Sequence, residues 1–166
     1  EISACLVGSE MCIRDRPDGF HFEFYKDGNM NDWINIHIES GEFCAIEEGI
    51  MIFHGFYDTF IQELNKRCIF IVDDKTNEKV GTATVSLLSK EELGYNGAVD
   101  WIAIKKDYQG KGLAKPLITK ILETANKLEH KGIILHTQTT TWLAAKLYLD
   151  LSLIHISEPT RQAEIS

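Results

Sequence analysis

One stretch of the sequence decides the fold, and it runs Ile102-Ala103-Ile104-Lys105-Lys106-Asp107-Tyr108-Gln109-Gly110-Lys111-Gly112-Leu113-Ala114. Its apolar, β-branched start predicts the end of a strand, and a helix is expected to begin at Leu113. A strand that enters a helix through a tight turn presents several backbone N–H groups and the positive end of the helix dipole to one place. The sequence therefore predicts a phosphate site at this turn.

The residue types in the turn fit the same interpretation. Gly110 and Gly112 allow positive φ angles and let an anion approach the backbone, while Lys111 and Lys115 add positive charge nearby. The pattern is Gln-x-x-Gly-x-Ala. A dinucleotide-binding fingerprint would need glycine at position 115, and a Walker loop would need Ser or Thr after a Gly-Lys pair, so neither alternative is satisfied.

Hydrophobic periodicity assigns the elements on either side of the turn. Strands are predicted at residues 20–24, 68–72, 80–87, 98–104 and 133–137, and helices at 29–40, 46–67, 113–128 and 142–150. A hairpin turn is expected at 73–79 and a polar loop at 89–97. The order β-α-α-β-β-β-α-β-α, a meander followed by a crossover, predicts one α/β (α+β) domain with a mixed, mostly antiparallel sheet.

Several side chains receive structural rather than chemical interpretations. Asn29 is expected to cap the first helix with Asp32 as its partner. Cys44 and Cys68 are expected to be small buried hydrophobic residues, and His136 a core histidine rather than a base. The aromatic residues of the second helix are treated as core, namely Phe53, Phe56, Tyr57 and Phe60.

Composition limits the function classes. A chain of 166 residues has the size of one domain, and its net charge of -8 argues against general nucleic-acid binding. The four cysteines show no zinc-like spacing, and His21, His37 and His54 share no carboxylate, so no metal site is predicted. No apolar run is long enough for a membrane span, and a cytoplasmic protein is the expectation.

At this point the sequence resembles the GNAT acyltransferase family, whose coenzyme A pyrophosphate loop reads Arg/Gln-x-x-Gly-x-Gly/Ala after its fourth strand. A second match lies downstream, where Thr141-x-x-Ala144-x-x-Leu147-Tyr148 is similar to the family's Asn-x-x-Ala-x-x-Leu-Tyr helix. The resemblance covers about residues 20–150 and implies a sheet that splays apart between the strands ending at Ile104 and Thr137. Thr141 departs from the family's asparagine.

The resemblance also implies roles for individual residues. The pantetheine arm of coenzyme A would pair with the backbone of Ile102 and Ile104, and Thr141 and Tyr148 would complete the cofactor site. The pyrophosphate would meet the N–H groups of the turn, which are those of Gln109, Gly110, Lys111, Gly112, Leu113 and Ala114. Tyr148 is the candidate acid that protonates the leaving thiolate, and Asp100 is the candidate base.

The implied function is acetyl-CoA-dependent N-acetylation of a small-molecule amine or an exposed protein amine. A non-catalytic acyl-CoA-binding module, and a nucleotide-binding or purely structural domain, remain as alternatives. Residues 17–89 are acidic, with Glu42, Glu47 and Glu48 on the acceptor side implied by the family, whereas residues 90–150 are slightly basic. A cationic acceptor amine would be attracted to the acidic half.

The first and last sixteen residues are related to each other at the level of DNA. Codons chosen for residues 151–158 have a reverse complement that encodes residues 9–15, and the relation continues between residues 162–166 and 1–5. Both segments resemble a translated transposon-end sequencing adapter. We therefore expect one domain at 17–150, lacking the family's last strands, with a strand at 133–137 whose outer edge is open.

Overall fold

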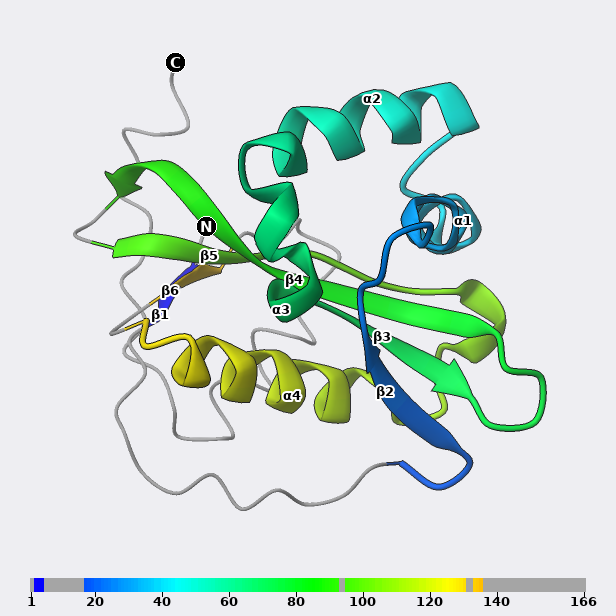
Figure 1. Ribbon diagram of the computed structural model, residues 1–166. Helices are drawn as coiled ribbons and strands as arrows, with labels where there is room; N and C mark the ends of the chain where they lie inside the picture. Colours follow the sequence, from blue (N-terminus) through cyan, green and yellow to red (C-terminus); the bar gives the residue numbers. More distant parts are fainter. Residues whose placement is uncertain (1, 5–16, 93–94, 131–132, 136–166) are drawn as a thin grey trace.

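The computed structural model describes residues 2–4, 17–92, 95–130 and 133–135, which form one mixed sheet with helices on both faces (Figure 1). The strands lie in the order β1-β6-β5-β4-β3-β2, and only the β5–β6 pair is parallel. The strands are β1 (Ile2–Ala4), β2 (Phe20–Phe24), β3 (Cys68–Asp73), β4 (Lys79–Glu92), β5 (Tyr95–Ile104) and β6 (Ile133–Leu135). The predicted fold class is confirmed.

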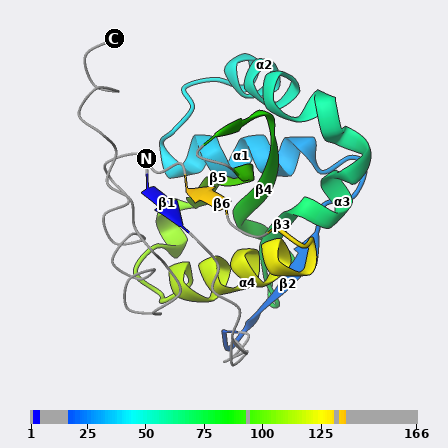
Figure 2. The ribbon, with the colours of Figure 1, turned by 90° about the vertical axis from the view of Figure 1, so that its left-hand side faces the viewer.

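The helices cover the two faces of the sheet separately. One face carries α1 (Met30–Ser40) and α2 (Ile46–Tyr57), and the opposite face carries α4 (Ala114–Lys127), as the turned view shows (Figure 2). Two short elements, η1 (Asp58–Glu63) and α3 (Leu64–Arg67), connect α2 to β3, and η2 (Lys106–Tyr108) follows β5. None of the helices in the described part of the chain combines the length and apolar character that crossing a membrane requires.

Alternation along the strands builds two cores, one on each face. Ile69 and Ile71 of β3 pack toward α4, whereas Phe70 and Val72 pack toward α1 and α2. Successive side chains of a strand point to opposite faces of the sheet. Because β3 is buried on both faces, its sequence is a continuous apolar run. The α4 side chains in the first core are Leu117, Ile118, Ile121, Leu122 and Ala125.

The second predicted helix is broken. Residues 46–67 form α2, η1 and α3, because Phe60 adopts the non-helical angles φ −137° and ψ 29°. The kink keeps Tyr57, Phe60 and Leu64 buried, which a straight helix of this length would not achieve against a twisted sheet. Tertiary packing therefore overrides the regular helical spacing.

The prediction of a polar loop at residues 89–97 is wrong. β4 extends to Glu92 and β5 begins at Tyr95, with Leu87 opposite Gly97 and Glu92 opposite Tyr95. Backbone pairing satisfies the N–H and C=O groups of a hairpin whatever its side chains are, so polar composition alone does not exclude a strand.

Three smaller predictions also need correction. The side chain of Asn29 caps no helical N–H group; its oxygen accepts from the N–H of Lys26 and its amide donates to Asp32. Cys68 is buried as predicted, but Cys44 is exposed. β1 pairs antiparallel with β6, so the outer edge that we expected to be open is covered along residues 133–135.

Two helical glycines give a matched test of the α1–α2 packing. A Cβ at Gly49 would lie 2.6 Å from Cγ2 of Ile34, whereas a Cβ at Gly55 meets nothing within 4 Å. We expect Gly49→Ala to lower the free energy of unfolding by about 1–2 kcal/mol through overpacking. Gly55→Ala should raise it by about 0.5–1 kcal/mol through helix propensity.

Thermal or urea unfolding of the two variants measures both effects. Equal stabilisation by both substitutions would show that α1 and α2 do not pack as closely as described.

Candidate active site

The turn between β5 and α4 contains a run of backbone N–H groups that have no backbone partner among the described residues. Within the described residues, none of the N–H groups from Gly110 to Lys115 donates to a backbone acceptor, and Pro116 has no N–H. The first backbone bond of the helix runs from the Leu117 N–H to the Leu113 carbonyl at 3.1 Å. Unpaired N–H groups together with the helix dipole make this end of α4 suited to an anion.

The backbone conformation of the turn requires glycine at two positions. Gly110 has φ 76° and Gly112 has φ 74°, a region that residues with a Cβ adopt at a cost. Among the described residues, a Cβ on either glycine would meet nothing within 4 Å, so it would point into open space. The turn is therefore a backbone cradle with room for a group to approach it.

Side chains of the turn tie it to the sheet. The Tyr108 hydroxyl donates to Asp73 Oδ2 at 3.0 Å, and Lys111 Nζ lies 4.7 Å from the centre of the Tyr108 ring. Gln109 Nε2 donates to the carbonyl of Ile104 at 2.9 Å. These contacts fix the turn against the end of β5 and place one ammonium group beside it.

A β-bulge interrupts β5 just before the turn. Thr82 of β4 faces Ala103 and Thr84 faces Asp100, so a single β4 residue stands opposite Trp101 and Ile102. Trp101 adopts the left-handed angle φ 50°, which is uncommon for a bulky residue and marks local strain.

The bulge lies just after the β5–β6 pairs that the structure describes. Among the described residues, β5 pairs with β6 only at Ala98 and Val99, and the edge from Asp100 to Ile104 has no strand partner. An unpaired strand edge offers N–H and C=O groups to an extended ligand. Ile102 and Ile104, which are predicted to hold the pantetheine arm, both lie on this edge. The carbonyl of Ile104 accepts a hydrogen bond from Gln109 Nε2.

Asp100 is a buried carboxyl group that stands next to the bulge. Its side chain is 6% exposed and accepts a hydrogen bond from the Ser86 hydroxyl at 2.7 Å. Burial raises the pKa of Asp100 to about 7, and the Ser86 hydrogen bond opposes part of that rise. A carboxyl group that titrates near neutral pH can accept a proton, as a general base must.

The surroundings of Asp100 on this face are polar but uncharged. The Tyr57 hydroxyl donates to Thr84 Oγ1 at 2.9 Å, and burial raises the pKa of Tyr57 well above its usual value. Burial likewise raises the pKa of the Cys68 thiol to about 11, so this thiol is not a nucleophile at neutral pH. Asp100 is therefore the titratable group of this cluster.

An aromatic cluster lies beside Asp100 on the same face. The Trp101 ring is 5.7 Å from Trp33, 5.5 Å from His37 and 5.7 Å from Phe43, measured between ring centres. Phe56 contacts Trp101 edge to face at 5.0 Å and is 48% exposed. The prediction that Phe56 belongs to the core is therefore wrong, although Phe53, Tyr57 and Phe60 are buried.

The histidines do not form a shared centre. His21 contacts Glu23 and Asp74, His37 Nδ1 lies 2.8 Å from Glu42 Oε2, and His54 Nδ1 lies 2.8 Å from Asp58 Oδ1. In the described part of the chain, no group of three His, Cys, Asp or Glu side chains could hold a metal ion. Three predicted residues, Thr141, Tyr148 and His136, lie outside the described residues.

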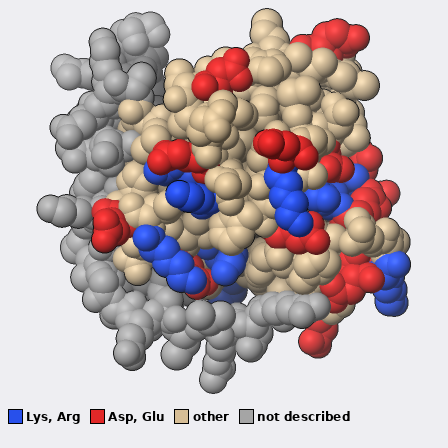
Figure 3. Space-filling model, in the orientation of Figure 1, with Lys and Arg blue, Asp and Glu red and all other residues tan. Residues whose placement is uncertain are grey.

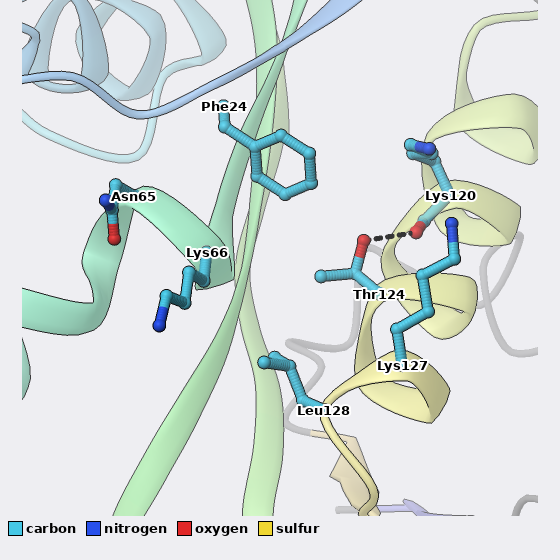
Figure 4. A pocket seen from close by; sticks show the side chains of 7 residues that line it. All are labelled: Phe24, Asn65, Lys66, Lys120, Thr124, Lys127 and Leu128. Atoms are coloured by element: carbon cyan, nitrogen blue, oxygen red, sulfur yellow. Dashed lines mark hydrogen bonds between the residues drawn. The ribbon is translucent and has the colours of Figure 1, made fainter.

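A surface pocket of about 310 Å³ lies away from the turn, between α3, the end of β2 and the second half of α4 (Figure 4). It is lined by Phe24, Asn65, Lys66, Lys120, Thr124, Lys127 and Leu128. Thr124 is ten residues along α4 from Ala114, roughly 15 Å at the rise of an α-helix. This pocket is separate from the cradle and from Asp100.

Solved structures with the same fold are acetyltransferases by their descriptions. A GCN5-related N-acetyltransferase from Sphaerobacter thermophilus matches with a TM-score of 0.71 and 15% identity, over 94% of this chain and 47% of that one. The aminoglycoside N-acetyltransferase AAC(6')-Iy, solved with a bisubstrate analogue of coenzyme A, gives 0.61 and 10% identity over 84% and 94%.

A third structure, glucosamine-6-phosphate N-acetyltransferase from Arabidopsis thaliana, gives a TM-score of 0.57 and 12% identity over 85% and 95% of the two chains. The match to the Sphaerobacter protein spans about half of that protein's length. No protein with a curated description matches the sequence.

The family comparison rests on sequence rather than on shape. The model of the acetyltransferase (GNAT) family matches residues 13–151, which include β2 to β6, the turn and the residues beyond it. The chain belongs to the GNAT acetyltransferase family.

Proposed function

We propose that this chain is an acetyl-CoA-dependent N-acetyltransferase that transfers an acetyl group to a primary amine by direct attack on the thioester. The observation that supports this most is the cradle of N–H groups from Gly110 to Lys115, which follows the stretch of β5 from Asp100 to Ile104; neither has a backbone partner on its open side among the described residues. The cradle suits a pyrophosphate and the edge suits an extended amide-containing arm. Coenzyme A has both parts.

The residues present fit coenzyme A at both ends of its extended form. The pyrophosphate would be held by the N–H groups of residues 110–114, with Lys111 adding charge, whereas the Gln109 N–H, predicted to join them, donates to the Lys106 carbonyl. The pantetheine amides would pair along β5 from Ile104 back toward Asp100, over four residue-to-residue steps of about 3.3 Å each, roughly 13 Å in all. Thr141 and Tyr148 would contact the same molecule. Coenzyme A supplies the acyl group as a thioester, which an amine can attack.

Two side chains would move protons in the reaction. Asp100, with a pKa of about 7, would accept the proton of the ammonium form of the acceptor, directly or through water. Tyr148 would donate its phenolic proton to the leaving thiolate. A backbone N–H of β5 would polarise the carbonyl oxygen. The acceptor is a small-molecule amine or an exposed protein amine.

A glycine substitution tests the cradle. We expect Gly112→Val to abolish coenzyme A binding, because its side chain would enter the space in front of the turn and resist φ 74°. Gly19→Val is the matched control, since Gly19 also has a positive φ, 82°, with nothing within 4 Å of its Cβ. Calorimetry with coenzyme A should show binding lost only in Gly112→Val. Unchanged affinity in a variant with native circular dichroism would end the phosphate-cradle interpretation.

The proposed acid is tested by removing one oxygen atom. Tyr148→Phe should lower kcat by about 10²–10⁴-fold with little change in KM for acetyl-CoA, because the proton is needed only when the thiolate leaves. Steady-state thiol release measures both constants. Turnover equal to that of the unmodified chain would assign Tyr148 a structural role.

The proposed base is tested through pH. The rate should rise with pH through about 7 as Asp100 loses its proton, and Asp100→Asn should lower kcat by about 10²–10⁴-fold. Ser86→Ala should move the inflection to higher pH, because the Ser86 hydrogen bond lowers the pKa of Asp100.

Stability gives an independent readout of the same group. The folded pKa of Asp100 lies above its unfolded value of 3.8, so the unfolded chain loses this proton first as pH rises. Stability is therefore lost between about pH 4 and 7, by at most about 4 kcal/mol for a shift of three units. Asp100→Asn should raise the Tm at pH 8 and leave it unchanged at pH 3. An inactive variant without this Tm gain would contradict the burial argument.

A further inference from the structure

We propose that the acceptor amine is carried on an apolar group of about the size of an aromatic ring, which packs against Phe56 and Trp101. This inference rests on the proposed function and specifies its substrate class. It starts from Phe56, which is a large apolar side chain left 48% exposed at the edge of the face that holds Asp100. Exposed apolar groups next to a candidate catalytic residue mark a ligand contact surface.

The bulge brings this surface next to the carboxyl group. Asp100 hydrogen-bonds Ser86 while Trp101 contacts Phe56, so two successive β5 residues present their side chains to the α1–α2 face. In a regular strand, neighbouring side chains would point to opposite faces. A group packed on Trp101 and Phe56 would therefore hold its amine near Asp100.

The aromatic surface is packed against buried rings, and its ring nitrogens are buried. Trp101 is supported from behind by Trp33, His37 and Phe43, which are buried. The indole nitrogen Nε1 of Trp101 is buried and has no hydrogen-bond partner within the described residues, and the same holds for Nε2 of His37. The polar atoms of these rings thus point inward, and the exposed part of Trp101 and Phe56 is carbon.

A carbon surface distinguishes between acceptor classes. Hydroxyl groups placed against it would lose their hydrogen bonds to water and gain none, whereas an apolar group gains by leaving water. Ring faces also attract an ammonium group. The surface therefore favours an apolar amine over a polyhydroxylated aminosugar.

The acidic side chains near this surface also discriminate between acceptor classes. Glu42 is hydrogen-bonded to His37, which contacts Trp101, and Glu47 and Glu48 stand in the first turn of α2. Figure 3 shows acidic side chains over the start of α2, whereas over α3 and α4 the Lys and Arg side chains lie among acidic ones. The acidic side chains at the start of α2 would attract a cationic amine and repel a phosphorylated acceptor.

Kinetics of the full chain with acetyl-CoA and three acceptors test the proposal: 2-phenylethylamine, neamine and glucosamine 6-phosphate. We expect kcat/KM for 2-phenylethylamine to exceed that for either sugar at least 10-fold. Phe56→Ser should raise KM for 2-phenylethylamine about 10-fold and leave KM for acetyl-CoA unchanged. Met51→Ser is the matched control, because Met51 is an apolar residue of α2 that is 69% exposed, and it should change neither constant.

The possible outcomes separate this inference from the function on which it rests. Faster acetylation of an aminosugar, or a KM that Phe56→Ser leaves unchanged, would overturn the apolar acceptor and leave the acetyltransferase standing. Coenzyme A binding without acetylation of any amine would overturn both and favour a non-catalytic acyl-CoA-binding module.

Discussion

The strained bulge at Trp101 is the constraint on which the candidate site depends. One extra residue in β5 moves Asp100 and Trp101 onto the same face of the sheet, and the described β5–β6 pairs, at Ala98 and Val99, come before this point. A regular strand would direct one of these side chains into the α4 core, where Ile102 and Ile104 pack. The left-handed angle of Trp101 costs free energy, and the ring contacts with Trp33, Phe43 and Phe56 offset it.

The second constraint is the burial of a carboxyl group without a cationic partner. Among the described residues, Asp100 has one hydrogen bond, from Ser86, and its neighbours Tyr57 and Thr84 are neutral. A nearby lysine or arginine would hold the pKa of Asp100 low, and the group could not then take a proton from an ammonium ion. The destabilising burial and the catalytic role would therefore have the same physical cause.

The sequence predicted the parts of the fold that depend on local pattern. The strand-turn-helix from Ile102 to Ala114 could be predicted because glycine positions and hydrophobic period report directly on backbone conformation. The kink at Phe60 and the strand residues beyond Leu87 could not, because both depend on partners distant in sequence. The bulge has no local signal either, since tryptophan is among the residues least suited to a positive φ.

The same distinction explains what was missed in the site. The family resemblance implies Asp100 as the base, but its partner Ser86 comes from β4 through a pairing that only the hairpin register defines. Phe56 follows the helical spacing of a core residue, yet it lies outside the buried stripe formed by Gly49, Phe53 and Tyr57. Periodicity identifies an apolar helix, but it cannot tell which apolar residue the neighbouring sheet leaves uncovered. In this protein, an aromatic residue left uncovered beside a buried carboxyl group is the feature that suggests an acceptor.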